Sequence, residues 1–191
     1  MSPSGRRGLL GMAELTFKIH TSIDGFVGRP SGDLSWLDPG FEDDELAAWE
    51  GDLLWRTDLH LMGRALYDDM AAYWPTSDEP YAAPMNQIPK AVLSRSITSA
   101  PWADDHVVGG DLTEAVGRLK KESTDGVLFH GGASTGRELA RLGLIDRWIL
   151  VHHPVALGEG LPIFAAEQAV RLEAAHVFEA SGAVALTYRP A

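Results

Sequence analysis

The stretch Val-Leu-Phe-His-Gly-Gly-Ala-Ser-Thr-Gly, residues 127–136, decides the fold class. Its apolar beginning, residues 127–129, is typical of a buried strand, and the glycines that follow end that strand. Residues 137–142 favour a helix that stops at Gly143. A buried strand that leads into a helix in this way is the unit of a parallel sheet with helices on both faces.

The same alternation of strand and helix continues on either side of this stretch. Strands are expected over residues 15–21, 58–62, 91–93, 106–108 and 148–151, and helices over residues 42–54, 64–72 and 113–121, the last with Asp111 or Thr113 as its cap. The runs 172–178 and 183–188 flank Ala-Ser-Gly and predict an antiparallel hairpin. The sequence therefore predicts a three-layer α/β/α fold with a mainly parallel central sheet and an antiparallel C-terminal hairpin.

Composition limits both the architecture and the partners. The chain has 191 residues, 45% of them hydrophobic, which suits one domain over residues 13–191 after a disordered tail over residues 1–12. It has no cysteine, which excludes disulfides and thiolate zinc sites and fits a reducing cytoplasm. The net charge of -11 opposes binding to nucleic acid or anionic lipid, and no membrane span is expected.

Three junctions between a strand and a helix carry residues that suit an anion. Glycines at 131 and 136, with Ala133 between them, nearly reproduce a dinucleotide-binding turn, but alone they are better explained as an ordinary tight turn. Gly63-Arg64 and Ser94-Arg95 each place a guanidinium at the end of a strand, where it suits a phosphate. Taken alone, each of these two junctions is also explained without a ligand, by a solvated arginine or by a polar turn. Together they favour NADPH over NADH, because a ribose 2′-phosphate requires cations.

The order and spacing of a longer set of motifs is more specific than any one of them. The set comprises Ser22-x-Asp24-Gly25-Phe26-Val27, Met62-Gly63-Arg64, Val92-Leu93-Ser94-Arg95, Gly131-Gly132, Leu144-Ile145-Asp146 and Pro154-Val155-Ala156-Leu157-Gly158-x-Gly160-x-Pro162-Ile163-Phe164. In this set the chain resembles the dihydrofolate-reductase superfamily. Within that superfamily it is most similar to stand-alone relatives of the riboflavin-biosynthesis reductase domain, the RibD C-terminal domain.

The resemblance implies an NADPH site. Its phosphates would bind Gly63 and Arg64, its adenosine end Ser94 and Arg95, and its pyrophosphate the run Gly131, Gly132, Ala133, Ser134 and Thr135. The nicotinamide would be lined by Ile19, Val27 and Gly28, and a mobile loop over residues 29–40 with Gly32 and Trp36 would cover it. We also expect Trp36 and Phe129 to contact the substrate. The resemblance further implies a homodimer, for which the edge hairpin and exposed apolar positions around Ile149 and Val151 would be suitable.

The proton donor stays open at this stage. Asp24 is the candidate that we name, although a turn at the end of a strand explains it equally well. Acids at positions 42–45 crowd the start of a helix, where the helix dipole alone accounts for them, and Asp38 is a further carboxylate. His152 and His153 are adjacent on a strand, so they point to opposite faces and do not form a metal pair.

The resulting hypothesis is hydride transfer from NADPH to a small heterocyclic or ribitylamine-like substrate. The activity would be most like that of 5-amino-6-(5-phosphoribosylamino)uracil reductase. Two alternatives remain, namely reduction of dihydrofolate and a module that binds NADPH without turnover. Deamination is excluded for this stretch of chain, because the zinc-deaminase motif needs cysteines.

Overall fold

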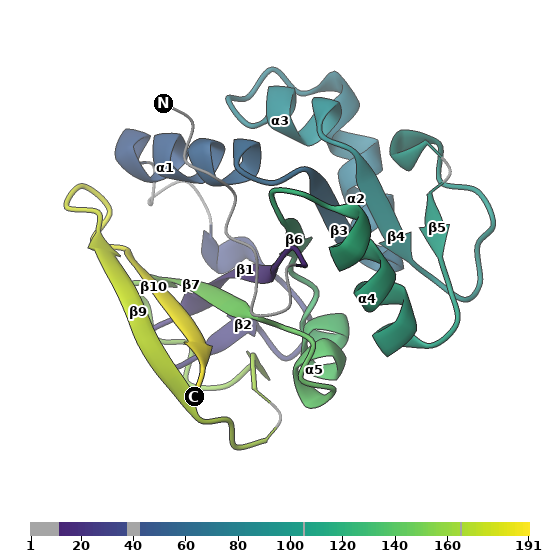
Figure 1. Cartoon of the computed structure of the whole chain (residues 1–191). Helices are drawn as coiled ribbons and strands as arrows, with labels where there is room; N and C mark the ends of the chain where they lie inside the picture. Colours follow the sequence, from purple (N-terminus) through teal and green to yellow (C-terminus); the bar gives the residue numbers. More distant parts are fainter. Residues whose placement is uncertain (1–11, 38–42, 105, 165) are drawn as a thin grey trace.

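The fold is built on an eight-stranded sheet with the order β5-β4-β3-β6-β1-β7-β10-β9 (Figure 1). The computed structural model describes residues 12–37, 43–104, 106–164 and 166–191. Six strands are parallel, and β10 and β9 add an antiparallel edge. The strands are β1 Leu15–Ser22, β3 Leu59–Gly63, β4 Lys90–Leu93, β5 Val107–Val108, β6 Val127–His130, β7 Arg147–His153, β9 Val170–Val177 and β10 Val184–Pro190.

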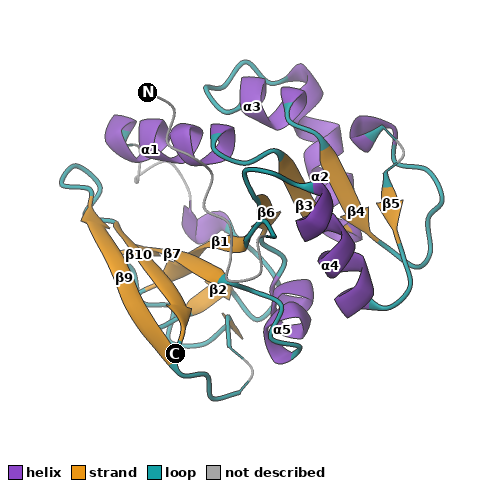
Figure 2. Cartoon of the chain, viewed as in Figure 1, coloured by secondary structure: helices purple, strands orange, loops and turns teal. Residues whose placement is uncertain are grey.

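Helices cover both faces of the sheet (Figure 2). Because side chains alternate along a strand, Leu61 and Phe129 enter the core cluster under one set of helices, while Met62 and Leu128 pack under the other set. The first set is α4 Leu112–Glu122 and α5 Ala133–Arg141, and the second is α1 Asp44–Trp55, α2 Arg64–Tyr73 and α3 Ala82–Gln87. The predicted three-layer α/β/α class, with an antiparallel C-terminal hairpin, is confirmed.

Helix α5 begins earlier than the sequence predicted. It starts at Ala133 rather than at residue 137, directly after Gly132, whose φ of 138° is accessible to glycine. The small residues at 133–136 resemble a loop, yet they let the helix approach the sheet closely. A Cβ on Gly136 would lie 2.6 Å from the ring of Phe17. The tight packing of α5 on β1, rather than helix propensity, therefore sets where the helix begins.

Three short elements were not predicted at all. Strands β2 (Phe26–Gly28) and β8 (Leu161–Pro162) form a separate two-stranded sheet, and α3 lies in a stretch that we did not assign. Two or three residues are too few for a periodic hydrophobic pattern. At the helix starts, Asp43 caps α1 and Asp111 caps α4, which settles the choice between Asp111 and Thr113.

The expectation that Ile149 and Val151 are exposed is wrong. They are 4% and 0% exposed, because α1 covers them through Leu46 and β10 flanks their strand. The exposed apolar side chains of the edge hairpin are instead on β9, at Leu172 and Val177. Most of the tail predicted over residues 1–12 lies outside the described residues. Among the described helices, none is long and apolar enough to cross a membrane.

Candidate functional site

The sheet opens where β1 and β6 separate. These strands pair only as far as Lys18 and His130, where β6 ends, whereas β1 continues along β7 as far as Ser22. In open α/β sheets, ligands bind in such a crevice beyond the carboxyl ends of parallel strands. Two groups of residues surround this opening. We call the group of Gly63-Arg64, Ser94-Arg95 and residues 131–135 the cofactor half, and the group around Lys18, Glu50 and His130 the acceptor half.

At two glycines of the cofactor half, the neighbouring side chains leave no room for a Cβ. A Cβ on Gly63 would lie 2.7 Å from Thr135 Oγ1, and a Cβ on Gly131 would lie 2.9 Å from Ile19 Cδ1. The end of β3, the start of α5 and Ile19 of β1 therefore meet here, where the resemblance places the cofactor. The first amides of α5, at Ala133, Ser134 and Thr135, belong to a helix N-terminus, which favours an anion.

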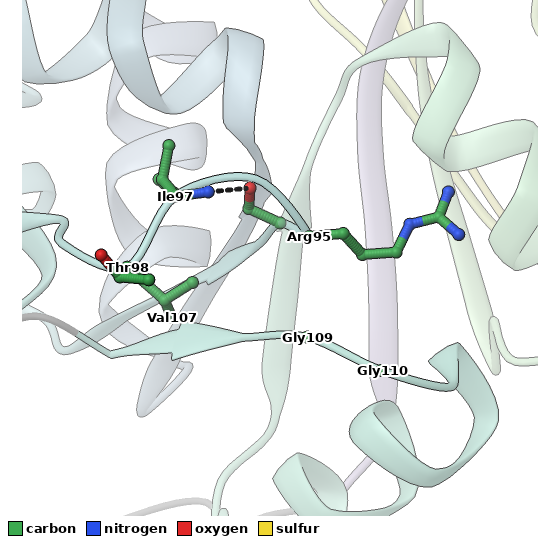
Figure 3. A pocket seen from close by; sticks show the side chains of 7 residues that line it. Arg95, Ile97, Thr98, Val107, Gly109 and Gly110 are labelled. Carbon is green, nitrogen blue, oxygen red and sulfur yellow. Dashed lines mark hydrogen bonds between the residues drawn. The ribbon is translucent and has the colours of Figure 1, made fainter.

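A cavity of about 450 Å³ extends this half across the ends of β4 and β5 (Figure 3). The Arg95 side chain points away from Ile97 and Thr98, which lie on the other side of the turn (Figure 3). The Ser94 hydroxyl oxygen accepts hydrogen bonds from the amides of Ser96 and Ile97, so it also stabilises the turn. The lining residues are Ser94, Arg95, Ile97, Thr98, Val107, Gly109 and Gly110. The sequence analysis had identified only the first two.

Arg64 is held beside this cavity by neighbouring side chains. Its Nη1 donates to Ser96 Oγ at 3.0 Å, and its Nε lies 3.4 Å from Asp68. Ser96 in turn lies 3.4 Å from the Ser94 hydroxyl. The structure thus brings the Gly63-Arg64 and Ser94-Arg95 junctions together, as the resemblance implied.

The segment expected to line the nicotinamide is more buried than the sequence suggested. Val27 is only 6% exposed and belongs to the main core cluster with Ile163, while Ile19 is partly buried at its edge. Gly28 lies close to the loop that carries Gly160, since a Cβ on Gly160 would be 2.3 Å from the Gly28 carbonyl oxygen. Strands β2 and β8 therefore pack on the main core cluster.

Trp36 lies inside the molecule and not at the tip of an open loop. It belongs to a short 3-10 helix, Ser35–Leu37, and is 6% exposed. Its ring meets the ring of His153 edge-on, with 5.8 Å between the centroids. Its buried indole nitrogen has no hydrogen-bond partner among the described residues. A buried N–H group without a partner costs free energy. A ligand oxygen that accepts a hydrogen bond from this nitrogen would remove that cost.

Phe129, which we expected to contact substrate, has a packing role in the structure. Its side chain is fully buried, and its ring centroid lies 5.0 Å from that of Phe17 in the main core cluster. The Phe129 side chain packs on the face of the sheet that α4 and α5 cover, whereas the next side chain, His130, lies on the opposite face. The residue that lines the acceptor half from β6 is therefore His130.

Asp24 is an anchor for a loop. Its carboxylate accepts hydrogen bonds from Ser22 Oγ at 2.5 Å, the Gly158 amide at 2.7 Å and the Leu157 amide at 3.2 Å. The hydrogen bond from Ser22 and those from the two amides hold the pKa of Asp24 below its usual value. A carboxyl group that stays ionised and fully engaged is a poor proton donor, so the geometry does not favour the catalytic role that we assigned to it.

The acids at the start of α1 also have other partners. Asp43 accepts from the amides of Glu45 and Leu46 and binds Ser181, and Glu45 lies 2.8 Å from His176. Asp38 and Glu42 lie outside the described residues. The buried carboxylate of this helix is further along, at Glu50.

Glu50 is the centre of the acceptor half. Its Oε1 lies 2.6 Å from Lys18 Nζ and 3.2 Å from His20 Nε2. Burial alone would raise the pKa of Glu50, but Lys18 and His20 hold it well below its usual value. The glutamate is therefore a carboxylate in a buried ion pair with Lys18.

Two histidines continue this network across the sheet. Lys18 Nζ lies 2.7 Å from His20 Nε2, and His20 Nδ1 lies 2.8 Å from His153 Nε2. Burial, and then His20, lower the pKa of His153 to about 4, so that imidazole is neutral at pH 7. His152 faces the other way and contacts Thr21 Oγ1.

A cavity of about 80 Å³ lies beside the ion pair. It is bounded by polar side chains from β1, α1 and β6, and by apolar side chains from α1 and α3. The lining residues are Lys18, Glu50, Leu53, Leu54, Tyr81, Met85 and His130. Burial, together with His60 and Lys18, holds the pKa of His130 well below its usual value, and burial with the charge of Glu50 raises that of Tyr81.

This half was not predicted from the sequence, although two signals for it were present. Lys18 and His20 alternate with the apolar residues of a strand that is otherwise buried, which places two polar side chains on one inner face. Glu50 stands in a helix beside Leu46 and Leu54, two of its buried positions. Buried polar residues of this kind are more informative than exposed ones.

The family follows from a comparison of the whole chain with known proteins. The family described as the RibD C-terminal domain matches residues 13–186. The chain belongs to this family. The domain is thus of a reductase type found in riboflavin biosynthesis, and the resemblance noted in the sequence is confirmed.

Individual relatives of this RibD C-terminal domain agree with that assignment. The chain is 29% identical over 166 residues to the uncharacterized protein YyaP of Bacillus subtilis, covering 81% of this chain and 82% of that protein. A putative riboflavin biosynthesis protein from Shewanella sp. PV-4 superposes with a TM-score of 0.71 at 27% identity, over 94% of this chain and 99% of the other. Dihydrofolate reductase from Enterococcus faecalis, in a complex with NADP(H), shares the fold at 14% identity. Its TM-score is 0.56, over 93% and 96% of the two chains.

Proposed function

We propose that this domain is an NADPH-dependent reductase of a small heterocyclic or ribitylamine-like acceptor. The observation that carries the proposal is the pairing of two different surfaces around one opening in the sheet. One is a glycine and arginine surface at the ends of β3, β4 and β6, and the other is a buried polar cavity under α1. A hydride donor and its acceptor need two such neighbouring sites.

The cofactor half fits a dinucleotide phosphate. Gly63 and Gly131 let Thr135 and Ile19 pack directly against the backbone, the N-terminus of α5 contributes free amides, and Arg64 and Arg95 supply positive charge. Two arginines near the adenosine end favour a 2′-phosphate over a free hydroxyl. When bound, the nicotinamide supplies a hydride.

The residues of the acceptor half would position and polarise the acceptor. Lys18 is held by Glu50 and directed at the cavity that it lines, so its remaining N–H suits an oxygen or nitrogen that gains negative charge. Trp36 and His153 close the opposite side of the network and limit the entry of water.

The first test is direct binding of nucleotides. We expect NADPH to bind the purified protein more tightly than NADH in calorimetric titrations, because only NADPH carries the 2′-phosphate. An absence of NADPH binding at millimolar concentration would contradict the proposal. Oxidation of NADPH is then followed at 340 nm, the absorbance band of the reduced nicotinamide, in the presence of candidate acceptors.

The choice of acceptor separates the alternatives. We expect turnover with the pyrimidine intermediate of riboflavin synthesis or a close analogue, and not with dihydrofolate. Turnover with dihydrofolate alone would reassign the substrate. If NADPH binds and a wide panel of carbonyl and imine compounds gives no oxidation, the domain is a binding module.

A further inference from the structure

Building on the proposed function, we infer that Arg137 is a positioning residue, which ties the strand pair β2-β8 to helix α5 and so fixes the place of the nicotinamide relative to the cofactor phosphates. Two of the residues proposed to line the nicotinamide are on β2, and the residues proposed to bind the pyrophosphate begin α5. Arg137 acts through these two elements and does not itself contact the reacting atoms.

Arg137 connects α5 and β8 by a direct hydrogen bond. Its Nη1 donates to the carbonyl oxygen of Pro162 at 2.9 Å. Side chains of an α-helix lean toward its N-terminus, so Arg137, at the start of the second turn, extends over the first turn on the face that Ala133 shares. The hydrogen bond therefore joins β8 to the helix close to the helix N-terminus.

The charge of Arg137 is not used to stabilise α5. In the part of the chain that the structure describes, Arg137 forms no ion pair, whereas Arg141 of the same helix binds Glu138 through hydrogen bonds of 2.8 and 2.7 Å. A cation near the N-terminus of a helix opposes the helix dipole. The position of Arg137 is therefore explained by what its guanidinium holds, which is the β8 carbonyl.

Strand β8 needs such an anchor because its pairing with β2 is short. Two residue pairs join the strands, Phe26 with Pro162 and Gly28 with Leu161, and the register shifts between them. Two-stranded ribbons are marginal by themselves in water. The pair therefore depends on neighbouring elements for its position.

A displacement of β8 passes directly to β2. A Cβ on Gly160 would lie 2.3 Å from the Gly28 carbonyl oxygen, so the two backbones touch at this point. Beyond β8, the Ile163 amide donates to the Gly25 carbonyl oxygen at 3.3 Å. Since β2 carries Val27 and Gly28, the hydrogen bond that fixes β8 also fixes the surface proposed for the nicotinamide.

Hydride transfer makes the position of this surface important. The two reacting carbons must lie about 3–3.5 Å apart, and a misplacement of about 1 Å can cost about 100-fold in rate. Because core packing of Val27 and Ile163 also holds the strand pair, loss of the Arg137 hydrogen bond should produce only part of that effect.

The first test measures hydrogen exchange in the protein without nucleotide. Arg137→Met keeps the length of the side chain and removes its donors, so we expect the amides of β2 and β8 to exchange about tenfold faster, as followed by mass spectrometry of peptic peptides. Arg137→Lys keeps a charged donor and should retain most of the protection. The matched control is Arg141→Met, which removes a guanidinium from the same helix and should leave exchange in β2 and β8 unchanged.

Two results of this test would overturn the inference. One is unchanged exchange of β2 and β8 in Arg137→Met. The other is equal acceleration in Arg141→Met, which would show a general loosening of α5 rather than release of β8.

The second test separates positioning from direct binding of a phosphate. We expect Arg137→Met to bind NADPH within about threefold of the unmodified protein in calorimetric titrations. With an acceptor that the oxidation assay identifies, hydride transfer in a single turnover should be about tenfold slower in Arg137→Met and should recover in Arg137→Lys. A loss of NADPH affinity of about tenfold or more in Arg137→Met would make Arg137 a direct phosphate ligand and overturn the positioning role.

Failure of the inference differs from failure of the proposed function. If the unmodified protein does not bind NADPH, the proposed function fails, and hydrogen exchange still decides whether Arg137 holds β8. If NADPH binds and exchange in Arg137→Met is unchanged, the inference alone fails.

Discussion

The cofactor half and the acceptor half differ in how the chain builds them. The cofactor half consists of short contiguous motifs at strand ends, Gly63-Arg64, Ser94-Arg95 and residues 131–135, which are close to the surface. The acceptor half consists of side chains from β1, α1, β6 and α3 and from Tyr81 just before α3, all of which line one cavity. One half is therefore visible as sequence motifs, and the other exists only once the elements pack.

The difference has a chemical cause. Phosphates are recognised by backbone amides and guanidinium groups, which a strand end and the following helix supply locally. A small acceptor is recognised by the shape and charge of a buried cavity, for which each element contributes one or two side chains. Variants in the two halves should consequently have different effects.

The largest expected effect is on selection of the cofactor. In the double variant Arg64→Ala and Arg95→Ala, NADPH affinity should fall about 100-fold, because two charged hydrogen-bonding partners are lost. NADH affinity should fall less, because NADH has no 2′-phosphate and shares with NADPH only the phosphates that we assign to Arg64. The control is Arg56→Ala with Arg141→Ala, which removes two exposed arginines elsewhere. Equal losses for both nucleotides would contradict the assignment.

Acid stability should report on the buried histidines behind the acceptor half. Burial, with Lys90 nearby, lowers the pKa of His60 to about 4 from a usual value of 6.5. Between these values only the unfolded chain takes up the proton, so the free energy of unfolding decreases as the pH falls from 6.5 to 4. For His60 this loss amounts to about 3 kcal/mol.

The variant His60→Leu should remove that part of the pH dependence, as measured by chemical denaturation at several pH values. His106→Gln, a histidine outside both halves, is the control. If His60→Leu and the unmodified protein lose stability in parallel over this range, His60 titrates normally in the folded state.

A smaller effect is expected from the glycine surface. Gly63→Ala places a Cβ 2.7 Å from Thr135 Oγ1, so the Thr135 side chain at the start of α5 must move. We expect NADPH affinity to fall by about tenfold, roughly 1.4 kcal/mol, with little change in thermal stability. Gly117→Ala in α4, where the added Cβ meets no neighbour, should have no effect on binding. An unchanged affinity for Gly63→Ala would separate this position from the cofactor.

The smallest effect should come from Asp24. Asp24→Asn weakens the anchoring of the Leu157–Gly158 loop, so we expect a modest decrease in melting temperature by scanning calorimetry. The pH dependence of turnover should keep its shape, because Asp24 stays ionised and does not donate the proton. Asp52→Asn, an exposed partner of Arg56, is the control. A turnover profile that loses its acid limb in Asp24→Asn would restore Asp24 as the catalytic acid.

Much of the fold could be predicted from the sequence, and the exceptions share a cause. The strands and helices of the parallel sheet have periodic hydrophobic patterns, so α1, β6 and β7 lie within a few residues of their predicted positions. The start of α5 and the strands β2 and β8 depend on close contacts such as Gly136 against Phe17 and Gly160 against Gly28. Such contacts between distant segments leave no local pattern.

By itself, the sequence determined the class of fold and the family, and it predicts anion binding at three strand ends, because each of these depends on neighbouring residues. Only the tertiary structure decided that Phe129 belongs to the core, that Asp24 holds a loop, and that Lys18 and Glu50 pair next to His130. Lys18 and Glu50 are 32 residues apart in the chain, and His130 is 80 residues further on. These three side chains form one site only when α1 packs across the opening between β1 and β6.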